Sequence, residues 1–114
     1  MKLLTTSQRE TLIANFRQNQ QNLGETDHWP VVKLFTPDAN ATWLLTEFDP
    51  VEELLFGLCD LGLGLPELGY VALAELTELR GPFGLAVECD RYWQPEGPLS
   101  AYVEDTTRRG HIQA

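Results

Sequence analysis

Two apolar runs separated by a short turn segment most constrain how this chain can fold. "VVKLF" follows Pro30, "TWLLTEF" follows soon after, and "TPDANA" between them supplies the Pro, Asp and Asn typical of turns. The pattern predicts a β-hairpin over residues 31–48 with a loop of about six residues. Strict alternation along the second strand places Trp43, Leu45 and Glu47 on one face. The other face is also partly apolar, so we expect an interior strand that is covered on both sides.

The remaining segments complete a small α+β pattern. Residues 5–20 have helical spacing of apolar residues, and either Thr5 or Ser7 could open a capping box at the start of this helix. We expect further elements in four places: a strand over 54–63, a short strand over 70–73, a short helix over 74–80 and a last strand over 85–93. The sequence therefore predicts a mostly antiparallel sheet of about four strands, with an N-terminal helix and a short helix before the last strand.

The length of 114 residues suits one domain and is too short for two. We expect that domain to span residues 1–105. Residues 106–114 then form a frayed C-terminal tail.

Negative charge is concentrated in the middle of the chain. The net charge is −9, and residues 25–79 hold eleven acidic residues against Lys33 alone, a local charge of −10. Such a segment repels DNA, RNA and anionic membranes, so direct nucleic-acid binding is disfavoured. The sequence has no run of eighteen apolar residues and no apolar core for a secretory signal. We therefore expect a soluble cytoplasmic protein with no membrane contact.

The residue types that most often hold metals or cofactors are sparse. Cys59 and Cys89 are too far apart in sequence for a CxxC site, and we expect both to be free thiols packed as small apolar groups. His28 and His111 have no ligand partner at helical spacing and no adjacent nucleophile. We expect no cofactor and no resident metal.

Several sequence blocks, in a fixed order, resemble a known family. They are "PVVKLFTPDANATWLLTEFDP", "LFGLCDLG", "PELGYVALAEL" and "RGPFGLAVECDRYW". In this order they resemble the uncharacterised bacterial family catalogued as domain of unknown function 2958, over about residues 1–100. The resemblance implies a short protein that is often encoded on plasmids and other mobile elements. It implies no established activity.

Two functional hypotheses from different classes remain open. The leading one is a non-enzymatic acidic interaction domain that faces a basic partner protein, in one version a mobile-element accessory that mimics DNA phosphates and inhibits its partner. The alternative is a small metal-dependent hydrolase, which requires three of Glu47, Asp60, Glu88 and Asp90 to lie within about 5 Å of one another. A plain structural interpretation, a solvated sheet face, competes with both. No reactive constellation is evident, which favours a non-enzymatic role.

The candidate interaction residues are the acids on or beside the predicted strands, together with aromatic and basic neighbours. They are Trp43, Glu47, Asp49, Asp60, Glu67, Tyr70, Arg80, Glu88 and Asp90. Trp29 and Trp93 flank turn signals, so we expect one or both to be partly exposed.

Overall fold

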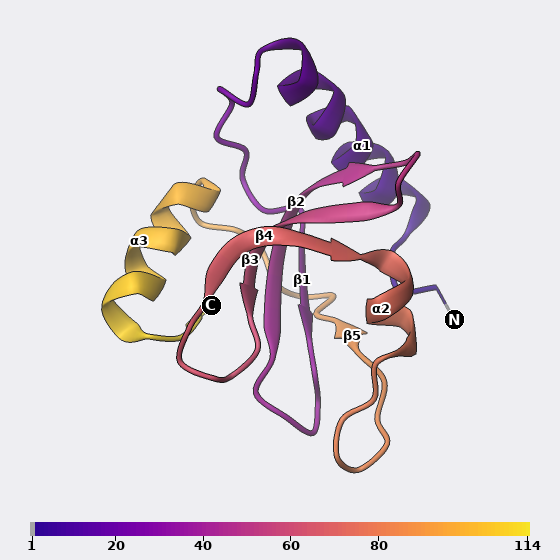
Figure 1. Cartoon of the computed structure of the whole chain (residues 1–114), viewed down its shortest axis with the longest axis vertical. Helices are drawn as coiled ribbons and strands as arrows, with labels where there is room; N and C mark the ends of the chain where they lie inside the picture. The colour runs from indigo at the N-terminus through magenta and orange to yellow at the C-terminus, as the bar shows by residue number, and fades with distance from the viewer. Residues whose placement is uncertain (1) are drawn as a thin grey trace.

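The computed structural model describes residues 2–114, in which three helices flank a single five-stranded sheet (Figure 1). The elements in chain order are α1 (Thr6–Gln21), β1 (Val32–Phe35), β2 (Thr42–Asp49), β3 (Leu54–Asp60), β4 (Glu67–Ala72), α2 (Leu73–Glu78), β5 (Glu88–Cys89) and α3 (Leu99–Arg109). None of the helices in this part of the chain is both long and apolar enough to cross a membrane.

The sheet is antiparallel throughout, with strand order β4-β3-β2-β1-β5. The predicted hairpin is confirmed: β1 pairs with β2 across a loop of residues 36–41, with Leu34 opposite Trp43. The α+β class is also confirmed. The predicted last strand, over 85–93, is much shorter than expected, because only Glu88–Cys89 pairs with β1.

A β-bulge in β2 divides the sheet faces differently from the predicted alternation. The pairing with β3 shifts between Leu45 and Glu47, so Thr46 is an extra residue without its own partner. Trp43, Leu45 and Phe48 therefore share one face, and they pack in the core beneath α1. Glu47 moves to the opposite face. The predicted grouping of Trp43, Leu45 and Glu47 is wrong beyond the bulge.

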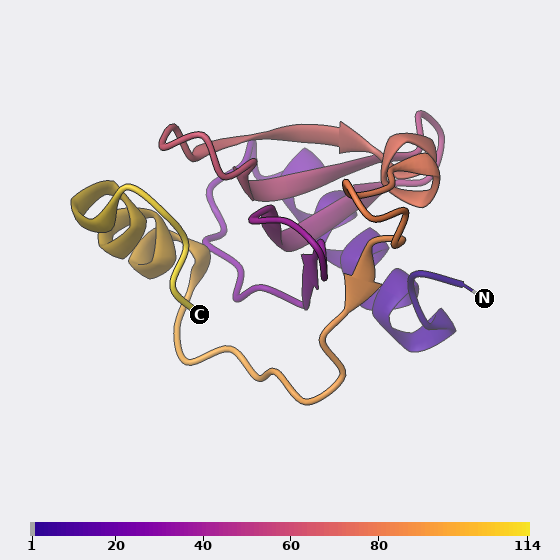
Figure 2. The ribbon, with the colours of Figure 1, turned by 90° about the horizontal axis from the view of Figure 1, so that it is seen from below.

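Two apolar clusters form on the two faces of the sheet. Leu12 of α1 is fully buried against the first face, which we call the α1 face. On the opposite face, which we call the α3 face, Leu44 and Leu58 pack with Leu99 of α3. The helices α1 and α3 consequently lie on opposite sides of the sheet (Figure 2).

The N-terminal helix begins and ends as the sequence predicts, to within about one residue. Thr5, and not Ser7, opens the capping box: its side chain accepts from the Gln8 backbone N–H, and the Gln8 side chain accepts from the Thr5 N–H. The helix ends before Gly24, whose N–H donates to the carbonyl of Asn19 at 2.8 Å.

The frayed tail expected from residue 106 is not what the structure shows. Thr106 is buried within α3, which continues to Arg109 and ends at Gly110 in the left-handed conformation. The helix forms because Leu99, Val103 and Thr106 fall on one stripe that faces the sheet. After it, the backbone N–H of Ile112 donates to Asp60 at 2.8 Å, which fixes the chain end against β3.

Candidate functional site

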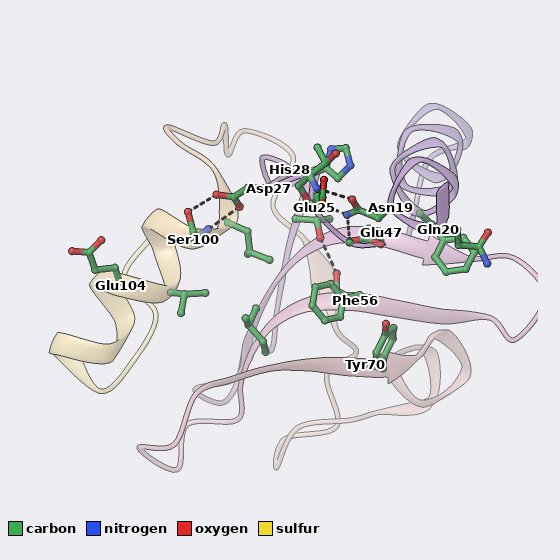
Figure 3. A pocket seen from close by; sticks show the side chains of 17 residues that line it. Asn19, Gln20, Glu25, Asp27, His28, Glu47, Phe56, Tyr70, Ser100 and Glu104 are labelled. Carbon is green, nitrogen blue, oxygen red and sulfur yellow. Dashed lines mark hydrogen bonds between the residues drawn. The ribbon is translucent and has the colours of Figure 1, made fainter. Parts of the chain in front are cut away.

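A groove on the α3 face combines apolar and charged side chains. Helix α3 and the residues after it cover the part of this face around Leu44, Leu58 and Asp60, and leave the other end open. The open end has a volume of about 610 Å³ and lies between the last turns of α1, the segment 24–28 that follows it, α3 and the sheet (Figure 3).

The floor of the groove is a row of three side chains on adjacent strands. Glu47 of β2 lies opposite Phe56 of β3, and Phe56 lies opposite Tyr70 of β4. The Phe56 and Tyr70 rings are in tilted contact, with centroids 5.0 Å apart. Tyr70 is 65% exposed although it lies on a sheet face. The bulge creates this row, because it places Glu47 on the same sheet face as Phe56 and Tyr70.

Asn19 of α1 holds the Glu47 carboxylate in place. Its Nδ2 donates to Glu47 Oε2 at 2.9 Å and to the carbonyl of Thr26 at 3.1 Å, and its Oδ1 accepts from the Thr26 N–H at 3.0 Å. One amide side chain thus joins the helix, the loop and the sheet. Asn15, one turn earlier, donates to the carbonyl of Thr46 at 2.9 Å.

The segment 24–28 is fixed to the start of α3. The carbonyl of His28 accepts from the Leu99 N–H at 2.9 Å, and the Asp27 carboxylate accepts from both the N–H and the hydroxyl of Ser100. These contacts satisfy two of the backbone donors that a helix N-terminus leaves unpaired, and they place a negative charge at the positive end of the helix. Asp27 acts as the cap that Pro98, at the N-cap position, cannot supply.

Carboxylates surround the groove, and none of its lining residues is a lysine or arginine. Glu25, Asp27, Glu47 and Glu104 line it together with the apolar floor and wall, and Glu25 and Glu104 are exposed. The Nε2 atom of His28, also in the lining, is buried and has no hydrogen-bond partner among the described residues. The site therefore presents an apolar surface with a negative rim, which suits a cation that carries an apolar stem.

The structure brings Glu47 and Tyr70 together in this groove, and it places Asp60 and Asp90 in the lining of a second pocket, of about 600 Å³. Trp43 is 2% exposed in the core, so it cannot contact a partner, and Asp60 is equally buried. Asp49 accepts from the N–H groups of Val51 and Glu52 in the turn after β2.

The remaining candidates lie on β4, after α2 or near β5. Glu67 begins β4 and is exposed, and Arg80 follows α2, where its guanidinium donates to the carbonyls of Thr77 and Leu79. Glu88 is exposed on β5. Asp90 forms an ion pair with Lys33 at 3.7 Å and accepts from the Tyr92 N–H.

The four acids of the hydrolase hypothesis do not converge. Glu47 and Asp60 lie near opposite ends of the β2–β3 pair, and Asp60 and Glu88 are separated by three strand spacings, about 14 Å. Within residues 2–114, no group of three His, Cys, Asp or Glu side chains is arranged to hold a metal ion. The geometric requirement of that hypothesis is therefore not met in the described chain.

Sequence reasoning missed most of the groove, because it missed α3. Among the lining residues that it did not single out are Asn19, Glu25, Asp27, Phe56, Leu68, Leu99, Val103 and Glu104. A signal was present: Leu99, Val103 and Thr106 have helical spacing, and Gly110 is a typical helix stop. The expectation about the tryptophans is confirmed for Trp29, which is 53% exposed, while Trp93 packs on Tyr102.

The two cysteines lie in one row across the sheet and cannot pair. Cys59 is opposite Trp43, Trp43 is opposite Leu34, and Leu34 is opposite Cys89. Three strand spacings, about 14 Å, separate them, whereas a disulfide needs Cα atoms within about 7 Å. Both are free thiols, as predicted. Burial, and secondarily the charge of Glu67 in the same row, raise the pKa of Cys59 from 9.0 to about 11.

Comparison with known proteins identifies one family. The model of the family described as "Protein of unknown function (DUF2958)" matches residues 3–113, nearly the whole chain. No curated protein and no solved structure matches the chain.

Proposed function

Because the chain belongs to the DUF2958 family, which carries no functional description, we propose a function from its own geometry: it is a protein-interaction domain that binds a basic segment of a partner protein in the groove on the α3 face. The observation that carries the proposal is the combination of an apolar floor, four carboxylates in the lining and no lysine or arginine there.

The floor has the chemistry to bind a lysine or arginine side chain. The methylene stem of such a side chain can cover Phe56 and Leu68, while its cationic head lies near Glu47 or over the Tyr70 ring. A cation over an exposed aromatic ring contributes about 0.5 to 1 kcal/mol, and more when water is excluded. The hydrogen bond from Asn19 holds Glu47 in position before a partner arrives, which lowers the entropic cost of binding.

The charge of the whole chain supports the same partner class. A net charge of −9 attracts basic proteins over long range and raises their association rate, an effect that salt weakens. The partner is therefore expected to be released as the salt concentration rises.

Two matched double variants test the groove. Glu25→Gln with Glu104→Gln neutralises two exposed carboxylates of the groove. Glu52→Gln with Glu78→Gln removes the same charge from exposed positions outside it. Each tagged protein is used to capture partners from a bacterial lysate at increasing salt, and the captured proteins are identified by mass spectrometry.

A specific partner should bind the wild type and the outer variant, and the groove variant should lose it at lower salt. Equal capture by both variants would show that binding depends on overall charge and not on the groove. Binding that survives high salt, or no capture at all, would contradict a basic partner.

The DNA-mimic version of this function makes one additional prediction. If the carboxylates replace DNA phosphates, the captured partner binds duplex DNA through the same surface. A duplex oligonucleotide should then release the partner from the immobilised protein at constant salt. If it does not, the protein still binds the partner, but it does not mimic DNA.

We also propose a cytoplasmic location, on the basis of the cysteines. Two free thiols held apart on one sheet face suit a reducing compartment, where unpaired cysteines persist. Location by fluorescence microscopy or cell fractionation in a bacterial host tests this directly.

A further inference from the structure

We infer that the partner segment binds as an extended strand along the free edge of β4, with a lysine or arginine side chain over Tyr70. This inference rests on the proposed function of the groove and specifies the conformation of the bound segment. It is carried by the position of β4 in the sheet and by the row of side chains that ends at Tyr70.

Strand β4 is an open edge. It is the outermost strand of the sheet and pairs with β3 alone among residues 2–114. In an antiparallel pair every second residue directs its N–H and C=O away from its neighbour, so a six-residue edge strand presents a line of unpaired groups. Figure 2 shows β4 along the outer border of the sheet, with no helix or loop running parallel to it on that side.

The edge lacks the features that usually protect such strands. Proteins block exposed edges with lysine, proline or bulges. Glu67–Ala72 reads "ELGYVA", contains none of these residues, and pairs with β3 in continuous register. Its only charge, at Glu67, is negative. A Cβ atom added at Gly69 would meet nothing within 4 Å, so no described residue covers the strand face at this position.

The groove continues this edge. In register, Glu47, Phe56 and Tyr70 form one row across β2, β3 and β4 on the α3 face. A residue of an added strand opposite Tyr70 would extend that row by one position, with its Cβ about 5 Å from the Cβ of Tyr70. Its side chain would lie on the same face as the groove, where an arginine or lysine can cover the exposed ring.

Charge complementarity indicates which kind of segment binds along the β4 edge. The groove beside the edge is lined by Glu25, Glu47 and Glu104 and by no lysine or arginine, so a basic segment is attracted to it. A second copy of this chain would bring another nine negative charges, and its own β4 carries only Glu67. The occupant is therefore a basic, extended segment of another protein.

A peptide of eight alternating arginine and valine residues with blocked ends tests this mode of binding. Two further peptides are methylated on backbone nitrogens. In the first, the backbone nitrogen of every arginine carries a methyl group, and in the second, that of every valine does. Each modification removes the hydrogen-bond donors along one edge of the peptide strand and leaves charge and side chains unchanged. Affinity for the full chain is measured by calorimetry, and protection of the β4 amides is measured by hydrogen exchange, with the β5 amides as the internal reference.

We expect the unmodified peptide and one methylated peptide to bind and to protect β4, and the other methylated peptide to bind at least tenfold more weakly. Tyr70→Ala should weaken binding about threefold to tenfold. Tyr92→Ala, which removes a tyrosine that is 94% exposed and lies outside the groove, should change nothing. The melting temperatures of both variants are measured, so that loss of the fold is not mistaken for loss of binding.

The outcomes separate this inference from the proposed function. If both methylated peptides bind as well as the parent, and the Glu25→Gln, Glu104→Gln variant binds it weakly, the groove binds basic segments without strand pairing and only the inference fails. If one methylated peptide does not bind, but the Glu25→Gln, Glu104→Gln variant binds the parent peptide normally, strand pairing is supported and the proposed function of the groove is contradicted. No binding of the parent peptide at millimolar concentration, or a dimer through β4 seen by sedimentation, overturns the inference.

Discussion

The carboxylate of Asp38 accepts a hydrogen bond from the backbone N–H of Phe83 at 2.8 Å, across 45 residues of sequence. The same oxygen accepts from the Leu85 N–H at 3.3 Å. Asp38 belongs to the "TPD" block in the β1–β2 loop, and the two donors belong to the "RGPFGL" block between α2 and β5. Two of the sequence blocks that carry the family resemblance therefore meet in one contact between loops, which gives them a structural role in this chain.

Gly81→Ala should destabilise the fold by breaking this contact. A Cβ atom at position 81 would lie 1.7 Å from Asp38 Oδ1, so the carboxylate would have to move and its hydrogen bonds to the 81–85 loop would be lost. We expect a decrease of about 1 to 3 kcal/mol in the free energy of unfolding, measured by urea denaturation. The control is Gly97→Ala, where the new methyl group would make an ordinary 3.5 Å contact with Ala101. Equal stability of the two variants would contradict this account.

Gly57→Ala should lower the free energy of unfolding more than Gly81→Ala does, because its new methyl group would clash with backbone atoms. A Cβ at position 57 would lie 2.1 Å from the carbonyl oxygen of Leu44, beside the bulge in β2. We expect a loss of about 3 kcal/mol, since relief requires the β2–β3 pair to separate locally. Gly69→Ala is a close control: Gly69 pairs directly with Gly57, yet a Cβ there meets nothing within 4 Å. Thermal unfolding of the three proteins tests the difference.

Gly57 lies beside the bulge in β2, where the alternation predicted from the sequence fails. The hairpin and the strand identities follow from composition and turn residues, and they are confirmed. Alternation, however, assumes one partner per residue, and the bulge at Thr46 breaks that assumption and moves Glu47 to the groove. A glycine inside an apolar strand often marks a bulge or a close backbone approach, so Gly57 was a usable signal.

The other omissions have different physical causes. Helix α3 was predictable from its spacing. The position of β5 was predicted but its short length was not, because only Glu88–Cys89 of the predicted strand finds a neighbour on β1. The groove depends on contacts between distant segments, such as Asp27 with Ser100, that no local pattern reveals. Of the proposed site, sequence reasoning therefore identified Glu47 and Tyr70 and could not place them together.

Leu23→Gly should stabilise the protein. Leu23 follows the end of α1 with φ of 60°, a left-handed conformation that is unfavourable for a side chain, and it is 92% exposed. Glycine removes that strain at the loss of almost no buried contact, so we expect a gain of about 0.5 to 1 kcal/mol. Leu63→Gly is the control, since Leu63 is also exposed but has no positive φ. A lower melting temperature for Leu23→Gly than for the wild type would refute the explanation.

Cys59 should react slowly with alkylating reagents. With its pKa near 11 in place of 9.0, the thiolate fraction at pH 8 is about a hundredfold smaller than in the unfolded chain. In a Cys89→Ser background, the rate with iodoacetamide should rise about tenfold per pH unit from 7 to 10 without a plateau. Because the folded pKa is the higher one, this thiol stabilises the fold below about pH 9, and that contribution is lost as the pH rises toward 11.

Removal of the Glu67 charge gives the matched test of Cys59. Glu67→Gln should lower the Cys59 pKa and increase the alkylation rate, though by less than unfolding does, because burial is the larger cause of the shift. Glu75→Gln, on α2, should leave the rate unchanged. If Glu67→Gln reacts no faster than Glu75→Gln, the raised pKa has no contribution from Glu67.

Asp27→Ala should loosen the start of α3 and, with it, one wall of the groove. The Asp27 carboxylate accepts from the N–H and the hydroxyl of Ser100 and interacts with the helix dipole, so its loss should cost about 1 kcal/mol. Hydrogen exchange should accelerate at the first turn of α3 and remain unchanged in β1. Glu25→Ala removes a neighbouring carboxylate that has no such contact, so it should leave exchange unchanged. Uniform acceleration over the whole chain, or none, would mean that Asp27 does not fix α3 to the segment 24–28. In that case α3 and the segment 24–28 would not be held together, and the groove between them would not be preorganised for the proposed binding.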